Sequence, residues 1–445
     1  MGLGTRLIRW CFGGHRWILP RKPHRAPGRL ATLQCPLLEY RAKIAPDHPP
    51  PPRCRLNNDI ATSTAASDPA IAPPLQPTVL YFARLGDMVM LTALLDFLHR
   101  RFHLPPQVIG AGPWNAEMYL ENPDVSDLWW FGRHFPFPLT LAWPRVARAL
   151  RASHPGPIYI CEHHYRQLPR IKRILSFAGV DPGRCVFINE IPGTVHHSVD
   201  RLIRLGERTP PLLNEADYPI PVQERPWAPR LCVSHSDRVD LQEWLTRRNW
   251  NGRPIILVQP GNHRSMSRKR NRWKRLNTDN KAWPTERWIT LLQRIHARMP
   301  DALIMLRGTD EEVKMLEEIR QAAGLDSVVV ASVYLRRLFA LCEHAHSMIS
   351  VDTGPAHAAG ALGLPLVVMY GAEEQRFWLP RSPFGSPVIG LGGPPDSVRA
   401  DQISVDAVFD AWCRLLERME AMPPRGPAEL PARVTATGLL KKIPA

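Results

Sequence analysis

The stretch SVDTGPAHAAGALGLPLVVMYG, residues 350–371, has the pattern of a strand, a turn, a helix and a second strand. The first strand ends at Val351, and Asp352-Thr353-Gly354 form the turn. Pro355 suits a first helical position, where its missing N–H would have no helical partner anyway. The helix expected over 356–362 is rich in small residues, so it can pack closely on a sheet. This alternation predicts parallel strands joined by crossover helices.

The same alternation continues on both sides of this stretch. In the C-terminal half we expect strands at 254–261, 302–308, 327–331, 346–352 and 365–371, and helices at 285–298, 311–323, 335–344, 355–363 and 404–420. In the N-terminal half we expect strands at 79–83, 107–111, 157–162 and 184–188, and helices at 88–102, 114–120, 141–152, 166–179 and 198–207. The sequence therefore predicts two doubly wound Rossmann-like α/β domains facing a cleft, with ligands beyond the carboxyl ends of the strands.

Composition shifts divide the chain into six expected segments. They are a basic arm at 1–77, an N-terminal domain at 78–225, a linker and connecting helix at 226–253, a C-terminal domain at 254–395, a helix at 396–425 and a tail at 426–445. The arm holds 13 of the 47 prolines and shows no regular period, which is typical of disorder. Its apolar stretch 7–19 is broken by charged residues, so no secretion signal is predicted.

Composition and charge narrow the classes of function. No stretch approaches the roughly 18–20 apolar residues of a membrane span. The eight cysteines form no CxxC pair, which argues against a zinc ribbon or thioredoxin-type site and favours a reducing cytoplasm. The net charge of +16 is concentrated in the arm and in residues 264–281. A nucleic-acid surface would carry a positive stripe across the fold, so this distribution instead favours an anionic ligand, with no nucleic-acid partner.

Two of the expected strand ends carry candidate acidic residues. At Asp352-Thr353-Gly354 the following helix N-terminus suits a phosphate, to which Thr353 adds a hydroxyl; an ordinary turn with a capping Asp or Thr is the alternative. Asp87 follows Gly86 just past the first strand. It would serve as a general base if a substrate hydroxyl comes within reach, or as the N-cap of the helix 88–102.

Two further strand ends carry a basic loop and a second acidic group. Lys281 lies just before the helix that begins near residue 284, and a cation beside helix N–H groups suits a diphosphate. The run 268–275 alone would also fit a nucleic-acid contact or a solvated loop. Glu311 or Glu312 would accept hydrogen bonds from ribose hydroxyls. The alternative is that the acid simply stabilises the first turn of the helix. The pairs His163–His164 and His196–His197 lack a partner cluster and are interpreted as surface residues.

The order of these motifs resembles glycosyltransferase family 9, the ADP-heptose:lipopolysaccharide heptosyltransferases. The resemblance covers about residues 78–420 and rests on RLGD, QPG, KAWPTERW, RGTDEE and the 350–371 stretch, in that order. It implies a GT-B fold with the donor in the C-terminal domain and the acceptor in the N-terminal domain. It also implies inverting transfer of a heptose from an ADP-sugar to a lipopolysaccharide inner-core hydroxyl, without a bound metal or other cofactor.

The resemblance also implies roles for individual residues. Asp87 would be the general base, and Lys281 would bind the donor phosphates and stabilise the departing ADP. The donor-binding residues would be Asp352, Thr353, Gly354, His357, Glu312 and Gly261, with Glu312 at the ribose. These roles agree with the chemistry, because an inverting displacement needs a base on one face and charge stabilisation of the leaving group on the other. A lipid-linked glycan acceptor would hold the cytoplasmic enzyme against the anionic inner membrane.

Some features depart from the family pattern. The arm 1–77 is not part of the family core, the loop 262–280 is longer and more basic, and Ala93 stands near a usual proline. The alternative is therefore another GT-B enzyme. It would use a different nucleotide-sugar donor, use a protein or other glycan acceptor, or act as a nucleotide-sugar epimerase. A non-catalytic protein that binds anions through the basic loop is the third reading.

Overall fold

A computed structural model describes nine segments of the chain. They are residues 72–112, 114–131, 142–152, 155–165, 167–192, 197–223, 225–262, 279–421 and 440–443. All of them belong to one compact unit, Pro69–Ala445. The expectations for most of the arm 1–77, for the basic run 268–275, for His196 and for most of the tail lie outside the described residues.

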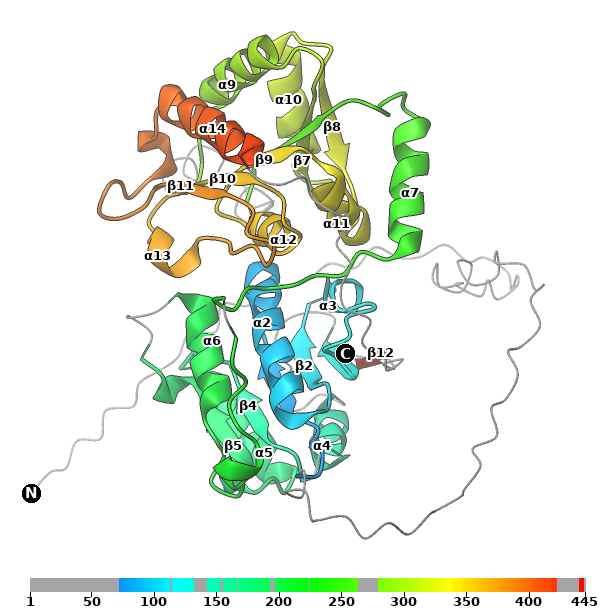
Figure 1. The fold of residues 1–445 in the computed structure, drawn as a ribbon, viewed down its shortest axis with the longest axis vertical. Coiled ribbons are helices and arrows are strands. Elements are labelled where there is room, and N and C mark those ends of the chain that lie inside the picture. Colours follow the sequence, from blue (N-terminus) through cyan, green and yellow to red (C-terminus); the bar gives the residue numbers. More distant parts are fainter. Residues whose placement is uncertain are drawn as a thin grey trace, which may run out of the picture. The chain divides into compact units, whose positions relative to one another are not determined.

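The N-terminal domain is built on a parallel sheet with the order β12-β3-β2-β1-β4-β5 (Figure 1). Its strands are β1 (Thr78–Tyr81), β2 (Gln107–Ala111), β3 (Asp127–Phe131), β4 (Ile158–Ile160), β5 (Cys185–Phe187) and β12 (Leu440–Ile443). Its helices are α2 (Leu85–Phe102), α3 (Trp114–Met118), α4 (Ala142–Ala152), α5 (Leu168–Phe177) and α6 (Ser198–Glu207). The strand order reverses between β1 and β4, and ligands bind at such a switch point in open α/β sheets.

The C-terminal domain has the order β11-β10-β9-β6-β7-β8, which repeats the first five strands of the N-terminal sheet but places the sixth strand at the opposite edge. Its strands are β6 (Ile255–Gln259), β7 (Leu303–Gly308), β8 (Val328–Ser332), β9 (Ser347–Val351), β10 (Leu366–Tyr370) and β11 (Val388–Gly392). Its helices, which begin with the connecting helix, are α7 (His235–Thr246), α9 (Thr285–Arg298), α10 (Val313–Ala323), α11 (Leu335–His344), α12 (Gly354–Ala361), α13 (Gln375–Trp378) and α14 (Val405–Glu420). The switch point lies between β6 and β9.

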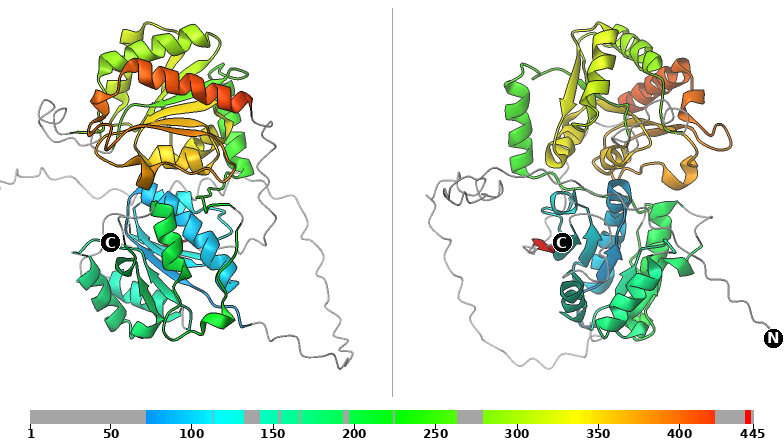
Figure 2. Two further views of the ribbon diagram at one scale, coloured as in Figure 1. Left: turned by 60° about the vertical axis from the view of Figure 1, so that its left-hand side comes forward. Right: turned by 180° about the vertical axis from the view of Figure 1, so that it is seen from behind.

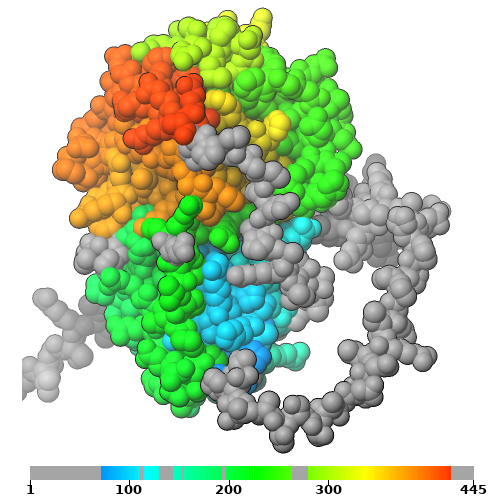
Figure 3. Space-filling view, viewed as in Figure 1, coloured from blue at the N-terminus to red at the C-terminus, as the bar shows by residue number. Residues whose placement is uncertain are grey.

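Burial explains why these elements form. The central strands β6, β9 and β10 are buried along their whole length, as expected for parallel strands covered by helices on both faces of the sheet (Figure 2). Trp288 of α9 and Trp412 of α14 are fully buried in the C-terminal core. The other side of α14 is at the surface, where Figure 3 shows it in orange-red. No helix in the described part of the chain combines the length and apolar character needed to cross a membrane.

The predicted doubly wound fold is confirmed, and three strands are additions to it. Strand β3 (DLWWF) lacks a regular alternation, and β11 (VIGLG) contains two glycines, which are rare in strands. Strand β12 is a four-residue edge strand with two lysines, paired with β3. Residues 440–443, expected within a tail, are therefore part of the N-terminal sheet. Helix α2 begins at Leu85 rather than at residue 88, which moves Asp87 inside the helix.

Candidate active site

The N-termini of helices α2 and α12 meet, and two glycines make this approach possible. A Cβ atom on Gly86 would lie 2.9 Å from Cδ2 of His357, and one on Gly354 would lie 3.1 Å from the backbone nitrogen of Gly86. Glycine is the residue that allows such close backbone approach. The two glycines come from the RLGD and DTG motifs, so the structure brings these distant motifs together at the switch points of both sheets.

Lys281 and Asp352 form an ion pair at the end of strand β9. The Lys281 Nζ atom lies 2.5 Å from Asp352 Oδ2, and the two side chains are only 15% and 9% exposed. His357 is buried on α12, with its Nε2 atom 3.9 Å from Asp352 Oδ1. Burial lowers the pKa of His357, and the Lys281 charge lowers it further, although Asp352 acts in the opposite direction. The structure thus brings together three residues that were predicted to bind the donor.

The N-terminus of α12 carries no side-chain cap among the described residues. Thr353 is the N-cap residue, but its hydroxyl lies 3.2 Å from the Ser350 hydroxyl instead of accepting from a helix N–H. Asp352 is engaged by Lys281 and does not cap the helix. The alternative interpretation of this turn as a capped helix start is therefore not what the structure shows. The helix terminus keeps the partial positive charge that favours an anion.

The position of Lys281 depends on residues that the sequence analysis did not single out. Asp279 Oδ1 accepts from the Lys281 N–H at 3.1 Å, and Asp279 Oδ2 accepts from the Asn262 amide at 2.9 Å. Both Asn262 and Asp279 are buried. An added Cβ on Gly371 would collide with the carbonyl oxygen of Asn280, so this glycine also shapes the turn. The only signal in the sequence was an acidic residue standing alone in a basic loop.

Asp279→Ala is expected to weaken nucleotide binding about tenfold, since it removes two hydrogen bonds that hold the Lys281 turn. Calorimetric titration with ADP tests this, with thermal unfolding of the same samples. The matched control is Asp301→Ala, a change of the same kind at an exposed turn. Equal ADP affinities in the two variants would show that Asp279 does not position Lys281.

Asp87 lies at the third position of α2, in the first turn. Its Oδ2 atom accepts from the Arg84 N–H at 3.3 Å, so it supports the helix start without being the expected N-cap. Burial raises the pKa of Asp87 and Asp352 raises it further, while the Arg84 N–H, His163 and the Arg84 charge lower it. Its second oxygen has no hydrogen-bond partner among the described residues. A carboxyl with a raised pKa and an available oxygen is a candidate general base.

The described histidines of these two pairs behave differently from each other. His163 and His164 are exposed, as expected, and the His163 charge acts on Asp87. His197 is half-buried and hydrogen-bonded, so it is not the free surface residue that was expected. Its Nδ1 accepts from the Val199 N–H at 3.1 Å and its Nε2 donates to the Leu379 carbonyl at 2.8 Å. Burial lowers the pKa of His197 to about 4, so it is neutral and links α6 to the segment after α13.

The remaining donor-side predictions are Gly261 and Glu312. Gly261 is buried at the end of β6, and its carbonyl accepts from the Gln259 amide at 3.0 Å. Glu312 is only 3% exposed, and its Oε2 atom accepts from the N–H and the hydroxyl of Thr309. Glu312 is the residue just before α10 and holds the preceding Thr309 turn, so the predicted place in the first helical turn is wrong; its ribose role stays a prediction. The exposed carboxylates at this strand end are Asp310 and Glu311.

The site places a candidate general base, Asp87, near two features that can stabilise negative charge. These are the Lys281 ammonium and the N-terminus of α12. Asp87 comes from helix α2 of the N-terminal domain, and the Lys281–Asp352 pair with the α12 terminus comes from the C-terminal domain. Such a pair of functions can deprotonate a hydroxyl and stabilise an anionic leaving group. Among the described residues, no group of three or more His, Cys, Asp or Glu is placed to hold a metal ion.

Comparisons with protein families and with known proteins agree with the family resemblance of these motifs. Residues 197–386 match the model of glycosyltransferase family 9 (heptosyltransferase). A lipopolysaccharide heptosyltransferase 3 of Escherichia coli is 30% identical over 104 residues, which are 23% of this chain and 31% of that protein. A second protein of this name, from strain K12, is 22% identical over 102 residues. The chain thus matches less than a third of the length of these relatives.

Solved structures resemble 78% of the chain. The ADP-heptose lipopolysaccharide heptosyltransferase II of Escherichia coli is 18% identical, with a TM-score of 0.58 over 78% of this chain and 100% of that chain. A family 9 glycosyl transferase from Veillonella parvula DSM 2008 is 15% identical, with a TM-score of 0.60 over 78% of this chain and 99% of that chain. At these identities the likeness concerns the fold, and it confirms the predicted GT-B architecture.

Proposed function

We propose that this chain is a member of glycosyltransferase family 9, an inverting glycosyltransferase that moves a heptose from an ADP-sugar to a lipopolysaccharide inner-core acceptor. The observation that carries the proposal is the meeting of the α2 and α12 N-termini, which brings Asp87 to the Lys281–Asp352 pair. The names of the matched heptosyltransferases support the choice of sugar and acceptor.

In the proposed reaction, the acceptor hydroxyl attacks the anomeric carbon while Asp87 takes its proton. The bond between the anomeric carbon and the phosphate oxygen breaks, and ADP leaves on the opposite face. Lys281 and the free N–H groups of α12 would stabilise the charge that develops on the diphosphate. Because Asp352 holds the Lys281 ammonium in a largely buried place, this cation would need little rearrangement to act.

The lipid-linked acceptor defines where such an enzyme works. We propose that it acts in the cytoplasm at the inner face of the inner membrane, as a peripheral protein. Each basic residue near an anionic membrane surface would contribute about 1 kcal/mol of attraction. Its partners would then be a nucleotide-sugar and a glycolipid, with neither a metal nor another cofactor.

Calorimetric titration of the full chain with ADP, UDP and GDP tests the donor assignment. We expect selective binding of ADP, weakened at least about tenfold in Lys281→Ala, because a charge-assisted contact is worth roughly 1.5–3 kcal/mol. A preference for UDP or GDP would contradict the ADP-sugar assignment. Failure to bind any nucleotide would overturn the enzyme proposal.

An assay of the sugar product separates transfer from epimerisation. ADP-heptose is incubated with the chain, with and without an inner-core lipopolysaccharide acceptor. A transferase forms the glycosidic product only when the acceptor is present. Conversion of the donor sugar without an acceptor would instead support the nucleotide-sugar epimerase alternative.

A further inference from the structure

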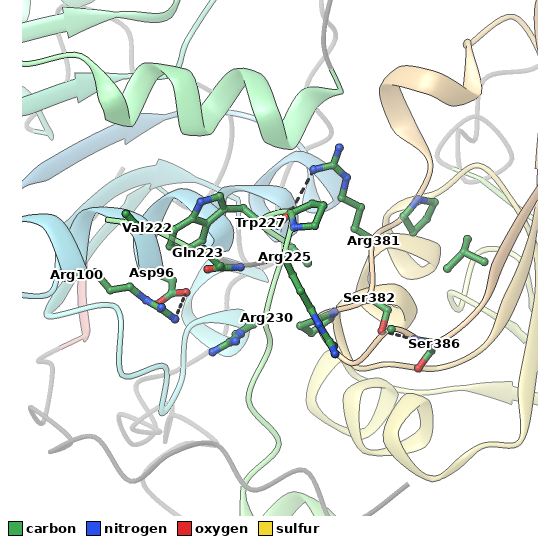
Figure 4. A pocket seen from close by; sticks show the side chains of 16 residues that line it. Asp96, Arg100, Val222, Gln223, Arg225, Trp227, Arg230, Arg381, Ser382 and Ser386 are labelled. Carbon is green, nitrogen blue, oxygen red and sulfur yellow. Dashed lines mark hydrogen bonds and ion pairs between the residues drawn. The ribbon is translucent and has the colours of Figure 1, made fainter. Parts of the chain in front are cut away.

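A basic pocket lies where the linker after α6 passes between helix α2 and the segment before β11. Its volume is about 770 Å³. Figure 4 shows side chains from three parts of the chain around it: Asp96 and Arg100 from α2, residues 222–230 from the linker, and residues 380–388 from the segment before β11. None of these residues has a role in the proposed transfer reaction.

Four arginines line this pocket, and only two of them have ion-pair partners. Arg100 makes two hydrogen bonds to Asp96, at 2.8 and 3.0 Å, and Arg381 makes two to Asp200, at 2.5 and 2.6 Å. The side chains of Arg225 and Arg230 have no hydrogen-bond or ion-pair partner among the described residues. Because the acids are already paired, the pocket keeps two positive charges that nothing in the described chain neutralises.

The walls of the pocket are held by hydrogen bonds, so the site is built before any ligand arrives. The Arg230 N–H donates to the Thr92 hydroxyl at 2.9 Å, which ties the linker to α2. Arg381 Nη1 donates to the Trp227 carbonyl at 3.2 Å, which ties the linker to the segment before β11. The Trp227 ring packs on Phe97, with centroids 5.3 Å apart, and lies 5.1 Å from the Arg100 guanidinium carbon.

A buried hydroxyl is the second sign of a polar ligand. Ser386 lines the pocket and is only 7% exposed, yet its Oγ atom has no hydrogen-bond partner among the described residues. Figure 4 shows Arg225 extending toward the loop that carries Ser382 and Ser386. A buried hydroxyl without a partner loses hydrogen bonds to water, and a ligand oxygen would restore one.

The pocket is separate from the proposed donor and acceptor site. Arg100 lies thirteen residues after Asp87 on α2, which corresponds to about 20 Å along the helix axis. On the other side, Val388 aligns with Leu366 of β10 and through it with Met348 of β9. Asp352 lies four residues beyond Met348, or about 13 Å along the strands. Val388 of the pocket is thus at the amino end of β11, and the proposed donor site is at the carboxyl ends of the strands.

We propose that this pocket is a second anion-binding site that takes a phosphate group. Arg225 and Arg230 supply the uncompensated charge, the Arg guanidinium geometry suits phosphate oxygens, and Ser386 supplies a hydroxyl. The site holds both a free phosphate compound and the phosphate of a lipid headgroup by the same contacts. It does not depend on the proposed transfer activity.

Calorimetric titration with inorganic pyrophosphate tests the proposal on the full chain. Because the donor site would also bind pyrophosphate, the titration is done in Lys281→Ala and in Lys281→Ala combined with Arg225→Ala and Arg230→Ala. The affinity is expected to fall at least about tenfold in the combined variant. The matched control removes two exposed arginines of α14, Arg414 and Arg418, in the same Lys281→Ala background. Thermal unfolding verifies that each variant folds.

An unchanged affinity for pyrophosphate in the combined variant, or an equal loss of affinity in the control variant, would overturn the proposal.

Sedimentation with vesicles identifies the source of the phosphate. Vesicles of phosphatidylcholine with and without phosphatidic acid are compared for the wild-type chain and for Arg225→Ala/Arg230→Ala. A phosphatidic-acid-dependent binding that this variant loses indicates a lipid headgroup. Loss of pyrophosphate binding alone indicates a soluble phosphate compound.

Discussion

Asp87→Asn is expected to lower the turnover number by about 10²–10⁴-fold and to leave ADP affinity nearly unchanged, because it removes the proposed general base and little else. The asparagine has nearly the same shape, and its oxygen can still accept from the Arg84 N–H. Transfer kinetics with ADP-heptose and an inner-core acceptor measure the loss, and calorimetry measures ADP binding.

Glu162→Gln is the matched control for this experiment. Glu162 is a buried acid that follows β4 at the same edge of the sheet, where its Oε1 atom accepts from the His164 N–H at 2.9 Å. We expect this variant to retain most of its turnover. A large loss in Glu162→Gln together with wild-type rates in Asp87→Asn would move the base to Glu162.

The pH dependence of the same reaction follows from the environment of Asp87. Burial raises its pKa, and a base works only as the carboxylate, so the rate should fall as the pH drops through this raised pKa. We expect the acid limb of the pH–rate profile to lie above the ordinary aspartate value of about 3.9 and to be absent in Asp87→Asn. An acid limb that persists in the variant would assign it to another group.

The raised pKa also predicts the sign of the stability change. A carboxyl whose pKa is higher in the folded state than in the unfolded state binds its proton more tightly when folded. Ionised Asp87 therefore costs stability above the raised pKa, and this cost disappears below the unfolded-state pKa. At neutral pH, thermal unfolding of Asp87→Asn should occur at the wild-type temperature or above it. A clear decrease would indicate that Asp87 acts mainly as a helix cap.

Lys281→Met is expected to lower the turnover number by about 10²–10³-fold, because it removes the preorganised charge that we propose stabilises the leaving diphosphate. It should also destabilise the fold by about 3–5 kcal/mol, since it leaves the buried Asp352 carboxylate without its partner. Transfer kinetics and denaturant unfolding measure the two effects separately.

The double variant Lys281→Met/Asp352→Asn separates the catalytic role of Lys281 from its structural role. Neutralising Asp352 removes the unpaired buried charge, so most of the lost stability should return. The turnover number should stay low because no cation replaces Lys281. If the double variant regained both stability and turnover, Lys281 would be a structural partner of Asp352 and not part of the reaction.

The helices could be predicted well wherever the local pattern was complete. The expected bounds of α6, α9 and α11 agree with the structure, because an apolar stripe and clear ends define each of them in the sequence. Strand β12 could not be found in this way. Its pairing with β3 joins residues about three hundred positions apart, and four residues with two lysines carry no strand signal.

Within the site, the residue types and their order along the chain were readable from the sequence. Asp87, Lys281, Asp352 and His357 each follow a strand or precede a helix, and parallel strands end at one edge of their sheet. Only the tertiary structure decided which of them meet. The Lys281–Asp352 pair, the Gly86–Gly354 approach and the Asn262–Asp279 contact all depend on long-range packing.

The sequence by itself determined the doubly wound architecture, the resemblance to a family and the chemical types of the candidate site, because periodicity and motif order are local properties. The tertiary structure alone decided the partner of each polar side chain. It turned Glu312 inward to Thr309 and joined His197 to Leu379. It also left the side chains of Arg225 and Arg230 without a hydrogen-bond or ion-pair partner among the described residues, beside a buried hydroxyl. The physical reason is that burial and hydrogen bonding depend on atoms brought together by folding, and those atoms are far apart along the chain.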